Sequence, residues 1–444
     1  MAADVSRPSV LWELVAESAD EAEFLFRQWE RALCSPSYNL QDVSRWVEDR
    51  LLGAMDGIRA GGRAAYEEVQ YPALASDEPT RICAAACVLA QAAAPDGLDA
   101  LAQRWRQARG PALAAVRRGV ELVASASLLS ALRWRLHDAA VPAQAALLQA
   151  HAFCGADPGS MADQAMASGE PLLRSAALRV AARLPQRVDR GMVEEALGAS
   201  DPAVVNAAIE AGLVAGSPAA LCRLAELLER PSAGSGVLLC VLAILGGPGA
   251  RARLVAALSD ERRLKVAVFA LAYSGTRAAA DTCVELLRQG LVPRLAADAL
   301  GIITGLDLRA SKLVRPEPDG EDAPIPFEQD DLDAELALME EDLLPLPDVD
   351  GVVAWWNQRR AAFRPEVRYL AGQPVSPLVL WQTLAQGPMR RRPPLALEVA
   401  IQRREFLLRT DAFTQDQWRQ LRQLQTAPDC TSAYAARGQY AERG

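Results

Sequence analysis

The stretch AVVNAAIEAGLVAG (203–216) sets the fold of this chain, because its pattern returns at regular intervals along the sequence. Alanine and leucine, the best helix formers, fill the stretch, and a glycine closes it. That closing glycine recurs at positions 216, 246, 275 and 305. Aligned on these glycines and on the prolines at 171, 202 and 231, four more stretches have the same shape: LLRSAALRVAARL (172–184), SGVLLCVLAILGG (235–247), RLKVAVFALAYSG (263–275) and PRLAADALGIITG (293–305).

A second helical stretch follows most of these segments, as in MVEEALGAS (192–200), ALCRLAELLER (220–230), RARLVAALSD (251–260) and ADTCVELLRQG (280–290). A repeat of roughly 30 residues made of two helices is typical of HEAT and armadillo α-solenoids. One helix pair cannot bury its apolar faces alone, but stacked pairs can. The sequence therefore predicts an all-α protein: a HEAT/armadillo-like α-solenoid of helical hairpins with N- and C-terminal helical units.

Helix ends are marked by proline and glycine. Pro171, Pro202 and Pro231 are expected to open successive units, since proline costs nothing in the first turn of a helix. Asp201 is placed to cap the helix that begins at Pro202. The glycine after the first helix of each unit is expected to adopt the left-handed conformation that ends a helix.

Four regions follow from these patterns. The first should be a hairpin of two long helices, and the solenoid should be clearest over 169–312, with two or three further helix pairs in 76–168. Between Glu317 and Asp350 there are 14 acidic residues and no basic one, so this part should repel itself and form no large core. The predicted regions are an N-terminal helical unit (1–75), the solenoid (76–312), an acidic, proline-containing linker (313–350) and a Trp/Arg-rich helical unit (351–444).

The acidic linker has two interpretations. It is either a solvated tether, which we favour, or an acidic docking strand that mimics the ligand of a basic site. One short amphipathic turn is expected at 332–344.

Charge and composition exclude several classes of function. The net charge of −9 and the pI near 5.1 argue against a nucleic-acid binder, which needs a basic surface. No secretory signal is evident at the start, and the longest apolar run, 237–247, is too short to span a bilayer. The cysteines lack the spacing of a disulfide framework, which favours a cytoplasmic protein without a membrane partner.

No pattern for catalysis stands out. The two histidines, His137 and His151, lie in no metal-ligand spacing, and Cys83 with Cys87 makes a poor zinc site without further ligands. Phosphate-binding loops and nucleophile elbows are absent from the sequence. We therefore expect no catalytic residue, metal or cofactor, and the oligomeric state stays open.

Two clusters near the C-terminus are candidates for contact with a partner. Trp355 and Trp356 are adjacent, so on one helix they point about 100° apart, and only one of them can face the core. The other is the best candidate for an interface hot spot. The run Arg390, Arg391 and Arg392 could grip an acidic partner or a phosphate, form a solvated loop, or pair with the acidic linker.

The C-terminal part also resembles a known family. The segments LPLPDVDGVVAWW (344–356), FRPEVRYLAGQPVSP (363–377) and LAQGPMRRRPPLALEVA (384–400), with residues 21–62, resemble bacterial HEAT-repeat-like proteins encoded beside type VI secretion genes. Glu366 departs from the family, where a glycine is expected before Arg368 and Tyr369. The matching positions include Trp355, Trp356, Arg368, Tyr369, Leu370, Gly372, Pro374 and Gly387.

The resemblance implies a role in handling a secreted protein. The first hypothesis is a cytoplasmic, non-catalytic adaptor or chaperone-like scaffold that binds a type VI secretion effector or spike-tip protein. The alternative is an immunity protein that neutralises a cognate toxin. An enzyme such as a HEAT-like lyase or DNA glycosylase is the third hypothesis, and the acidic charge argues against it.

Overall fold

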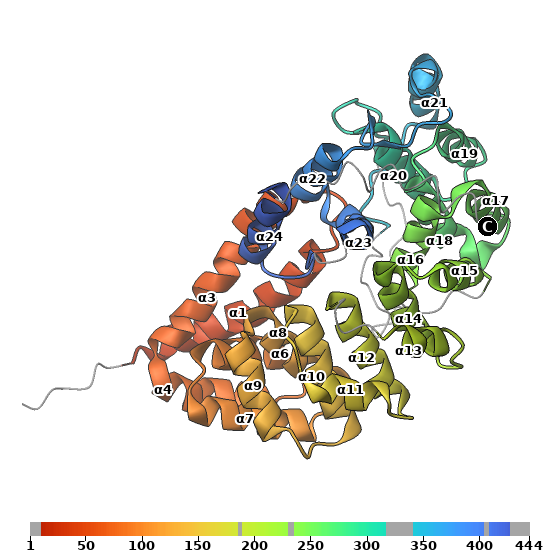
Figure 1. Cartoon of the computed structure of the whole chain (residues 1–444). Coiled ribbons are helices and arrows are strands. Elements are labelled where there is room, and N and C mark those ends of the chain that lie inside the picture. Colours follow the sequence, from red (N-terminus) through yellow and green to blue (C-terminus); the bar gives the residue numbers. More distant parts are fainter. Residues whose placement is uncertain (1–9, 185–188, 230–234, 317–340, 404–407, 427–444) are drawn as a thin grey trace, which may run out of the picture. The chain divides into compact units, whose positions relative to one another are not determined.

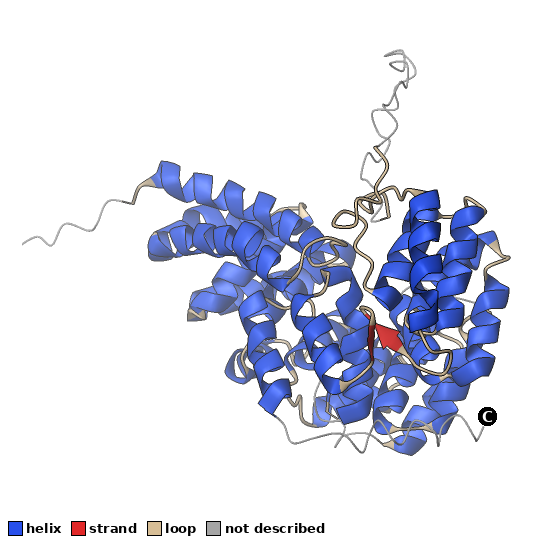
Figure 2. Ribbon diagram, turned by 90° about the horizontal axis from the view of Figure 1, so that it is seen from above, coloured by secondary structure: helices blue, strands red, loops and turns tan. Residues whose placement is uncertain are grey.

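The computed structural model describes residues 10–184, 189–229, 235–316, 341–403 and 408–426, and helices dominate all of these segments (Figure 2). The predicted all-α solenoid of helical hairpins is confirmed. Two compact units make up the chain. Unit 1 comprises Met1–Leu33, Leu40–Ala220 and Val399–Gln420, and unit 2 comprises Cys34–Asn39, Leu221–Glu398 and Leu421–Gly444.

Unit 1 begins with a long helix, α1, that packs against α3 (Figure 1). The chain leading into α3 includes one turn of π-helix, η1, and a second π-turn, η2, follows it. Buried Leu25, Trp29, Leu51 and Met55 join the two faces. The elements are α1 (Trp12–Ala32), α2 (Leu40–Val43), η1 (Ser44–Glu48), α3 (Asp49–Ala60), α4 (Gly62–Ala65), η2 (Tyr66–Gln70) and α5 (Tyr71–Ala75).

The solenoid of unit 1 is a stack of helix pairs. The first helices of the pairs pack one on the next in the order α6, α8, α10, α12 and α14. Gly119 on α8 touches the backbone of α6, and a Cβ there would overlap the carbonyl oxygen of Cys83. The helices are α6 (Pro79–Ala92), α7 (Pro95–Gln107), α8 (Gly110–Val123), α9 (Ala126–Arg135), α10 (Val141–Cys154), α11 (Ser160–Met166), α12 (Pro171–Arg183), α13 (Arg190–Leu197) and α14 (Pro202–Ala215).

The predicted helix ends are found with one exception. Helices α12 and α14 begin at their prolines, and the Asp201 carboxylate accepts hydrogen bonds from the N–H groups of Ala203 and Val204. Left-handed glycines lie at 216, 275 and 305, as predicted. Gly246 is different, because its φ is −79° and the left-handed residue is the next glycine, Gly247. Pro231 lies outside the described residues.

Residues 408–420 complete the core of unit 1. Buried Glu48, the last residue of η1, accepts hydrogen bonds from the Trp29 indole and from both the N–H and the hydroxyl of Thr414. Phe413 packs on Trp29, with ring centroids 5.0 Å apart. A C-terminal segment thus supplies partners for buried groups of the first helices.

Unit 2 continues the repeat with α16, α18 and α20 stacked in order and with α17 and α19 as second helices. α15 (Pro218–Glu226) spans the division between the units. The remaining elements are α16 (Gly236–Leu245), α17 (Gly247–Ala257), α18 (Glu261–Ala272), α19 (Arg277–Arg288), α20 (Pro293–Thr304), α21 (Val349–Arg359), η4 (Arg360–Ala362), β1 (Tyr369–Leu370), β2 (Gln373–Pro374), α22 (Pro377–Gln386), η5 (Met389–Arg391), α23 (Arg392–Arg403) and α24 (Thr414–Thr426).

The small hairpin β1–β2 caps the ends of two solenoid helices in unit 2. The N–H groups of Ala371 and Gly372 donate to the carbonyl oxygens of Ile302 and Ile303, in the last turn of α20. The Arg368 guanidinium donates to the carbonyl oxygen of Tyr273, just after α18. Because the last carbonyls of a helix have no partner within it, the hairpin supplies partners that the helices lack. This two-stranded hairpin is a departure from the all-helical prediction.

The ends of the acidic segment are paired with each other. Val314 and Pro347 form an antiparallel bridge, and backbone N–H groups of Arg315 and Asp348 donate to Leu346 and Leu313. The two ends of the acidic segment therefore lie side by side in unit 2. Most of the predicted linker, including much of the turn at 332–344, lies outside the described residues.

Candidate protein-binding site

The two candidate tryptophans separate as their spacing predicts. Trp356 is 1 % exposed, and its indole N–H donates to Asp281 of α19 at 2.9 Å. Trp355 is only partly buried and carries the guanidinium of Arg359 over its ring, 4.7 Å from the centroid. Trp356 is therefore a packing residue that fixes α21 on α19, and Trp355 is the one of the pair that can reach a partner.

The arginine run is turned inward. Arg391 forms a hydrogen-bonded ion pair with Asp298 of α20, and Arg390 lies 3.9 Å from the same carboxylate. The Arg390 guanidinium also stacks over the Phe269 ring of α18, 4.7 Å from its centroid. The partner of this run is thus a buried aspartate of the solenoid, a choice that the sequence did not single out.

Arg392 is completely buried in unit 2. Its Nε donates to the carbonyl oxygen of Leu384 at 2.6 Å, and an Nη atom lies 3.4 Å from the sulfur of Met389. Burial lowers the pKa of Arg392 to about 9, because the charged guanidinium is taken out of water. A fully buried side chain is not available to a partner, so Arg392 is corrected from a contact candidate to a packing residue.

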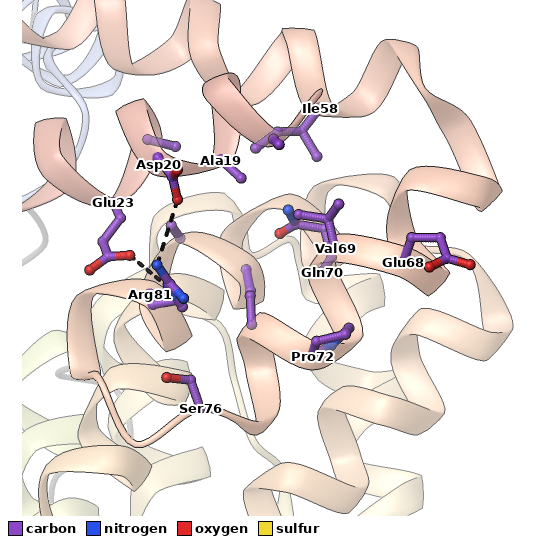
Figure 3. Close-up of a pocket in the computed structure, with 15 residues that line it drawn as sticks. Ala19, Asp20, Glu23, Ile58, Glu68, Val69, Gln70, Pro72, Ser76 and Arg81 are labelled. Atoms are coloured by element: carbon purple, nitrogen blue, oxygen red, sulfur yellow. Dashed lines mark hydrogen bonds and ion pairs between the residues drawn. The ribbon is translucent and has the colours of Figure 1, made fainter. Parts of the chain in front are cut away.

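One hollow in unit 1 lies between α1 and α6 and has a volume of about 250 Å³ (Figure 3). Its floor is apolar and contains Ile58 and Val69. At its rim Arg81 of α6 faces Asp20 and Glu23 of α1, with nitrogen–oxygen distances of 3.6 and 2.7 Å. The carboxylates of Asp20 and Glu23 are thus already paired with Arg81.

A larger groove in unit 1, of about 500 Å³, lies among α9, α10 and α11. Its apolar surface comes from Trp134, Met161 and the buried side chains of Leu136 and Leu147. Trp134 is 77 % exposed, the highest value among the exposed large hydrophobic side chains of the described residues. We call these ten lining residues the Trp134 groove: Ser130, Arg133, Trp134, Leu136, His137, Gln144, Leu147, Ser160, Met161 and Gln164.

The polar groups of the Trp134 groove suit a peptide. Its lining has no carboxylate, and the Arg133 guanidinium is held in place by a hydrogen bond to the carbonyl oxygen of Pro158 at 2.7 Å. Gln164 offers a side-chain amide, which can both donate to and accept from a peptide backbone, and Gln144 offers its amide oxygen, since its Nε2 donates to the carbonyl oxygen of Ala139. An exposed tryptophan beside amides and one fixed arginine is a composition typical of protein interfaces.

The sequence carries one signal for this groove, in the helix that contains Trp134. The helix α9 buries Leu128, Leu129 and Leu132, and Trp134 lies off that leucine stripe. A tryptophan on the solvent side of an amphipathic helix is unusual, because it exposes a large apolar surface to water.

His151 and several of the cysteines are engaged in packing. His151 is buried, and burial lowers its pKa, while its Nδ1 lies 3.2 Å from the carbonyl oxygen of Ala156. Burial raises the pKa of Cys87, Cys154 and Cys283 to about 12. Within the described residues there is no group of three or more His, Cys, Asp or Glu side chains that could hold a metal ion.

A search of the described helices finds none with the length and apolar character needed to cross a bilayer. No protein-family model matches the chain, and neither a curated protein nor a solved structure is significantly similar to it.

Proposed function

We propose that this protein is a cytoplasmic, non-catalytic scaffold that binds another protein, with the Trp134 groove as a contact site. The observation that carries the proposal is the exposed indole of Trp134, which stands over a groove of about 500 Å³ on a stack of helix pairs. Tryptophan is enriched among residues that dominate binding energy, because it buries a large surface at low entropic cost.

The class of partner follows from the family resemblance. We propose a type VI secretion effector or spike-tip protein as the partner, with this chain as an adaptor or chaperone-like factor. A protein that must hold an unassembled cargo needs an extended surface more than a deep pocket, and stacked helix pairs provide one.

A purification experiment tests the scaffold and the groove together. The tagged wild-type protein is purified from its host, and the co-purifying proteins are identified and quantified by mass spectrometry. Trp134→Ala should lower recovery of the main partner at least about tenfold, as expected for a hot-spot residue. Trp46→Ala is the matched control, because Trp46 is also exposed, at 58 %, but does not line the groove. Equal recovery with both variants contradicts the role of the groove.

Immunity is the second proposal. If the protein neutralises a toxin, its co-expression with the neighbouring toxin should restore growth of the producing cells. If it is an adaptor, deletion of its gene should abolish delivery of one effector without self-killing. These two results separate the adaptor from the immunity protein.

A further inference from the structure

Unit 2 contains a hollow of about 370 Å³ at the end of α20, beside the paired ends of the acidic segment. Its walls are mainly apolar and come from Leu306, Leu308, Leu344 and several prolines and alanines. Arg391 and Asp298 lie on its inner side, and Arg294 and Arg309 lie on its wall. We call this hollow the Arg391 pocket.

The charged groups behind the pocket are not fully satisfied. The side chains of Arg390 and Arg391 are 11 % and 19 % exposed. Both lie within ion-pair distance of one carboxylate, that of Asp298, whose side chain is 4 % exposed. Within the described residues, Nε of Arg391, an Nη of Arg390 and one carboxylate oxygen of Asp298 are buried without a hydrogen-bond partner. A buried donor or acceptor without a partner costs about 1–3 kcal/mol, so the charges behind the pocket are incompletely compensated.

The balance of charge favours an anionic ligand. The lining of the Arg391 pocket has three arginines against two aspartates, Asp298 and Asp307. Arg390 adds a second buried cation that shares the Asp298 carboxylate. Arginine is the side chain best suited to hold a carboxylate, since its planar N–H groups can donate in pairs.

We propose that the Arg391 pocket binds the free C-terminal carboxylate of a partner protein whose last residue is apolar. This proposal deepens the proposed scaffold function and rests on it. The carboxylate pairs with Arg391 and Arg309, and the apolar side chain lies against the leucines of the wall. A chain end carries a carboxylate next to the side chain of its last residue, so an apolar last residue matches both parts of this lining.

The test uses defined peptides and the full-length protein. The probe is a fluorescein-labelled peptide that ends in leucine with a free carboxylate, and binding is followed by fluorescence anisotropy. The same peptide with a C-terminal amide should bind at least about tenfold more weakly, because it loses a charge-assisted pair. An amidated peptide with an internal aspartate distinguishes a side-chain carboxylate from a chain end, and it should bind as weakly as the amide.

Variants place the binding at the pocket. Arg309→Gln changes an exposed arginine on the wall of the pocket and should weaken binding of the free-acid peptide about tenfold. Ser37 is an exposed loop residue that lines the pocket, so Ser37→Trp should block peptide binding. Arg288→Gln is the matched control, an arginine of the same unit that is 49 % exposed and does not line the pocket. Thermal unfolding of each variant checks that it is folded.

Three results would overturn the proposal. They are equal binding of acid and amide, no binding of any peptide, or wild-type binding by both pocket variants. Strong binding of the internal aspartate peptide would also contradict a chain end as the ligand. Failure of the scaffold function is seen separately in the purification experiment, as equal partner recovery with Trp134→Ala and Trp46→Ala, and that experiment needs no C-terminal peptide.

Discussion

The guanidinium of Arg368 donates two hydrogen bonds to the carboxylate of Glu398, at 2.6 and 2.9 Å, and both side chains are largely shielded from water. The same guanidinium donates to the carbonyl oxygen of Tyr273. This pair joins the β1–β2 hairpin to α23 and to the end of α18, so it fixes three elements of unit 2 with one side chain.

Arg368→Lys should destabilise unit 2 strongly, because lysine cannot reproduce the paired donors and leaves the buried Glu398 carboxylate poorly satisfied. Lysine keeps the positive charge, so the cost should stay below the roughly 3–5 kcal/mol of losing one member of a buried ion pair. Urea unfolding followed by circular dichroism measures the change. Arg288→Lys, in an exposed pair with Glu285, is the control and should cost less than about 0.5 kcal/mol. Similar small losses for both variants would show that the Arg368 pair is dispensable.

Gly275 and Gly290 provide a matched test of hairpin docking. Both have positive φ, at 64° and 68°. Alanine at either site must therefore adopt the left-handed conformation, which costs about 1–2 kcal/mol. A Cβ at Gly275 would also overlap the backbone of Tyr369, whereas a Cβ at Gly290 meets nothing. Gly275→Ala should therefore cost about 1–3 kcal/mol more than Gly290→Ala in urea unfolding. Equal losses would mean that the hairpin is not tightly seated on α18.

Glu48 should make stability depend on pH. Burial raises the pKa of its carboxyl group in the folded protein, although hydrogen bonds from Thr414 and Trp29 oppose the shift. A raised folded pKa means that the folded state holds the proton more tightly than the unfolded state. The stabilisation that Glu48 gives to the folded state is then fully present below the pKa of its carboxyl group in the unfolded chain, about 4.3. It is lost as pH rises through the pKa of that group in the folded protein.

The Glu48→Gln variant cannot ionise at this position, so comparison with it isolates the pH-dependent contribution of Glu48 to the free energy of unfolding. The free energy of unfolding of wild type minus that of Glu48→Gln should fall as pH rises above about 4.3 and then level off. Urea unfolding at a series of pH values measures the difference. If this difference in free energy of unfolding rises with pH or stays constant, the predicted role of Glu48 is contradicted.

The cysteines should divide sharply in reactivity. Cys34 and Cys222 are exposed, and the other five described cysteines are buried or half-buried. A thiol whose pKa is raised to about 12, such as that of Cys87, is ionised in roughly one molecule in ten thousand at pH 8. The variant Cys34→Ser/Cys222→Ser/Cys430→Ser should lose the fast phase of reaction with a disulfide reagent until denaturant is added. A fast phase that persists in this variant would place another thiol at the surface.

Much of the fold could be predicted because its signals are local. Asp201 before Pro202 and Ser376 before Pro377 encode helix starts within a few residues, and both side chains cap their helices. The repeat itself was visible because alanine and glycine recur at the same points of each helix pair. The split between Trp355 and Trp356 also needed only helical geometry.

The hairpin and the partners of the arginine run depend on distant residues. The turn of the hairpin is Ala371–Gly372, with positive φ at both residues, and alanine gives no sequence signal for such a turn. It is held by the carbonyl groups at the end of α20. In the same way Arg391 pairs with Asp298, which lies 93 residues earlier in the sequence, and no local sequence pattern predicts that pair.

The place of residues 408–420 in the sequence determines how early in synthesis unit 1 can finish folding. Arg118, on α8, donates to Glu30 and to the carbonyl oxygen of Asp411, and it lies over the rings of Trp29 and Phe153. A ribosome releases α1 and α8 long before residue 411, so Glu48 and Arg118 must wait for their last partners until residues 411–414 have been made. A nascent chain truncated before residue 408 would leave Glu48 and Arg118 incompletely paired, and the early helices would stay open to proteases and to chaperones until residues 408–420 arrive.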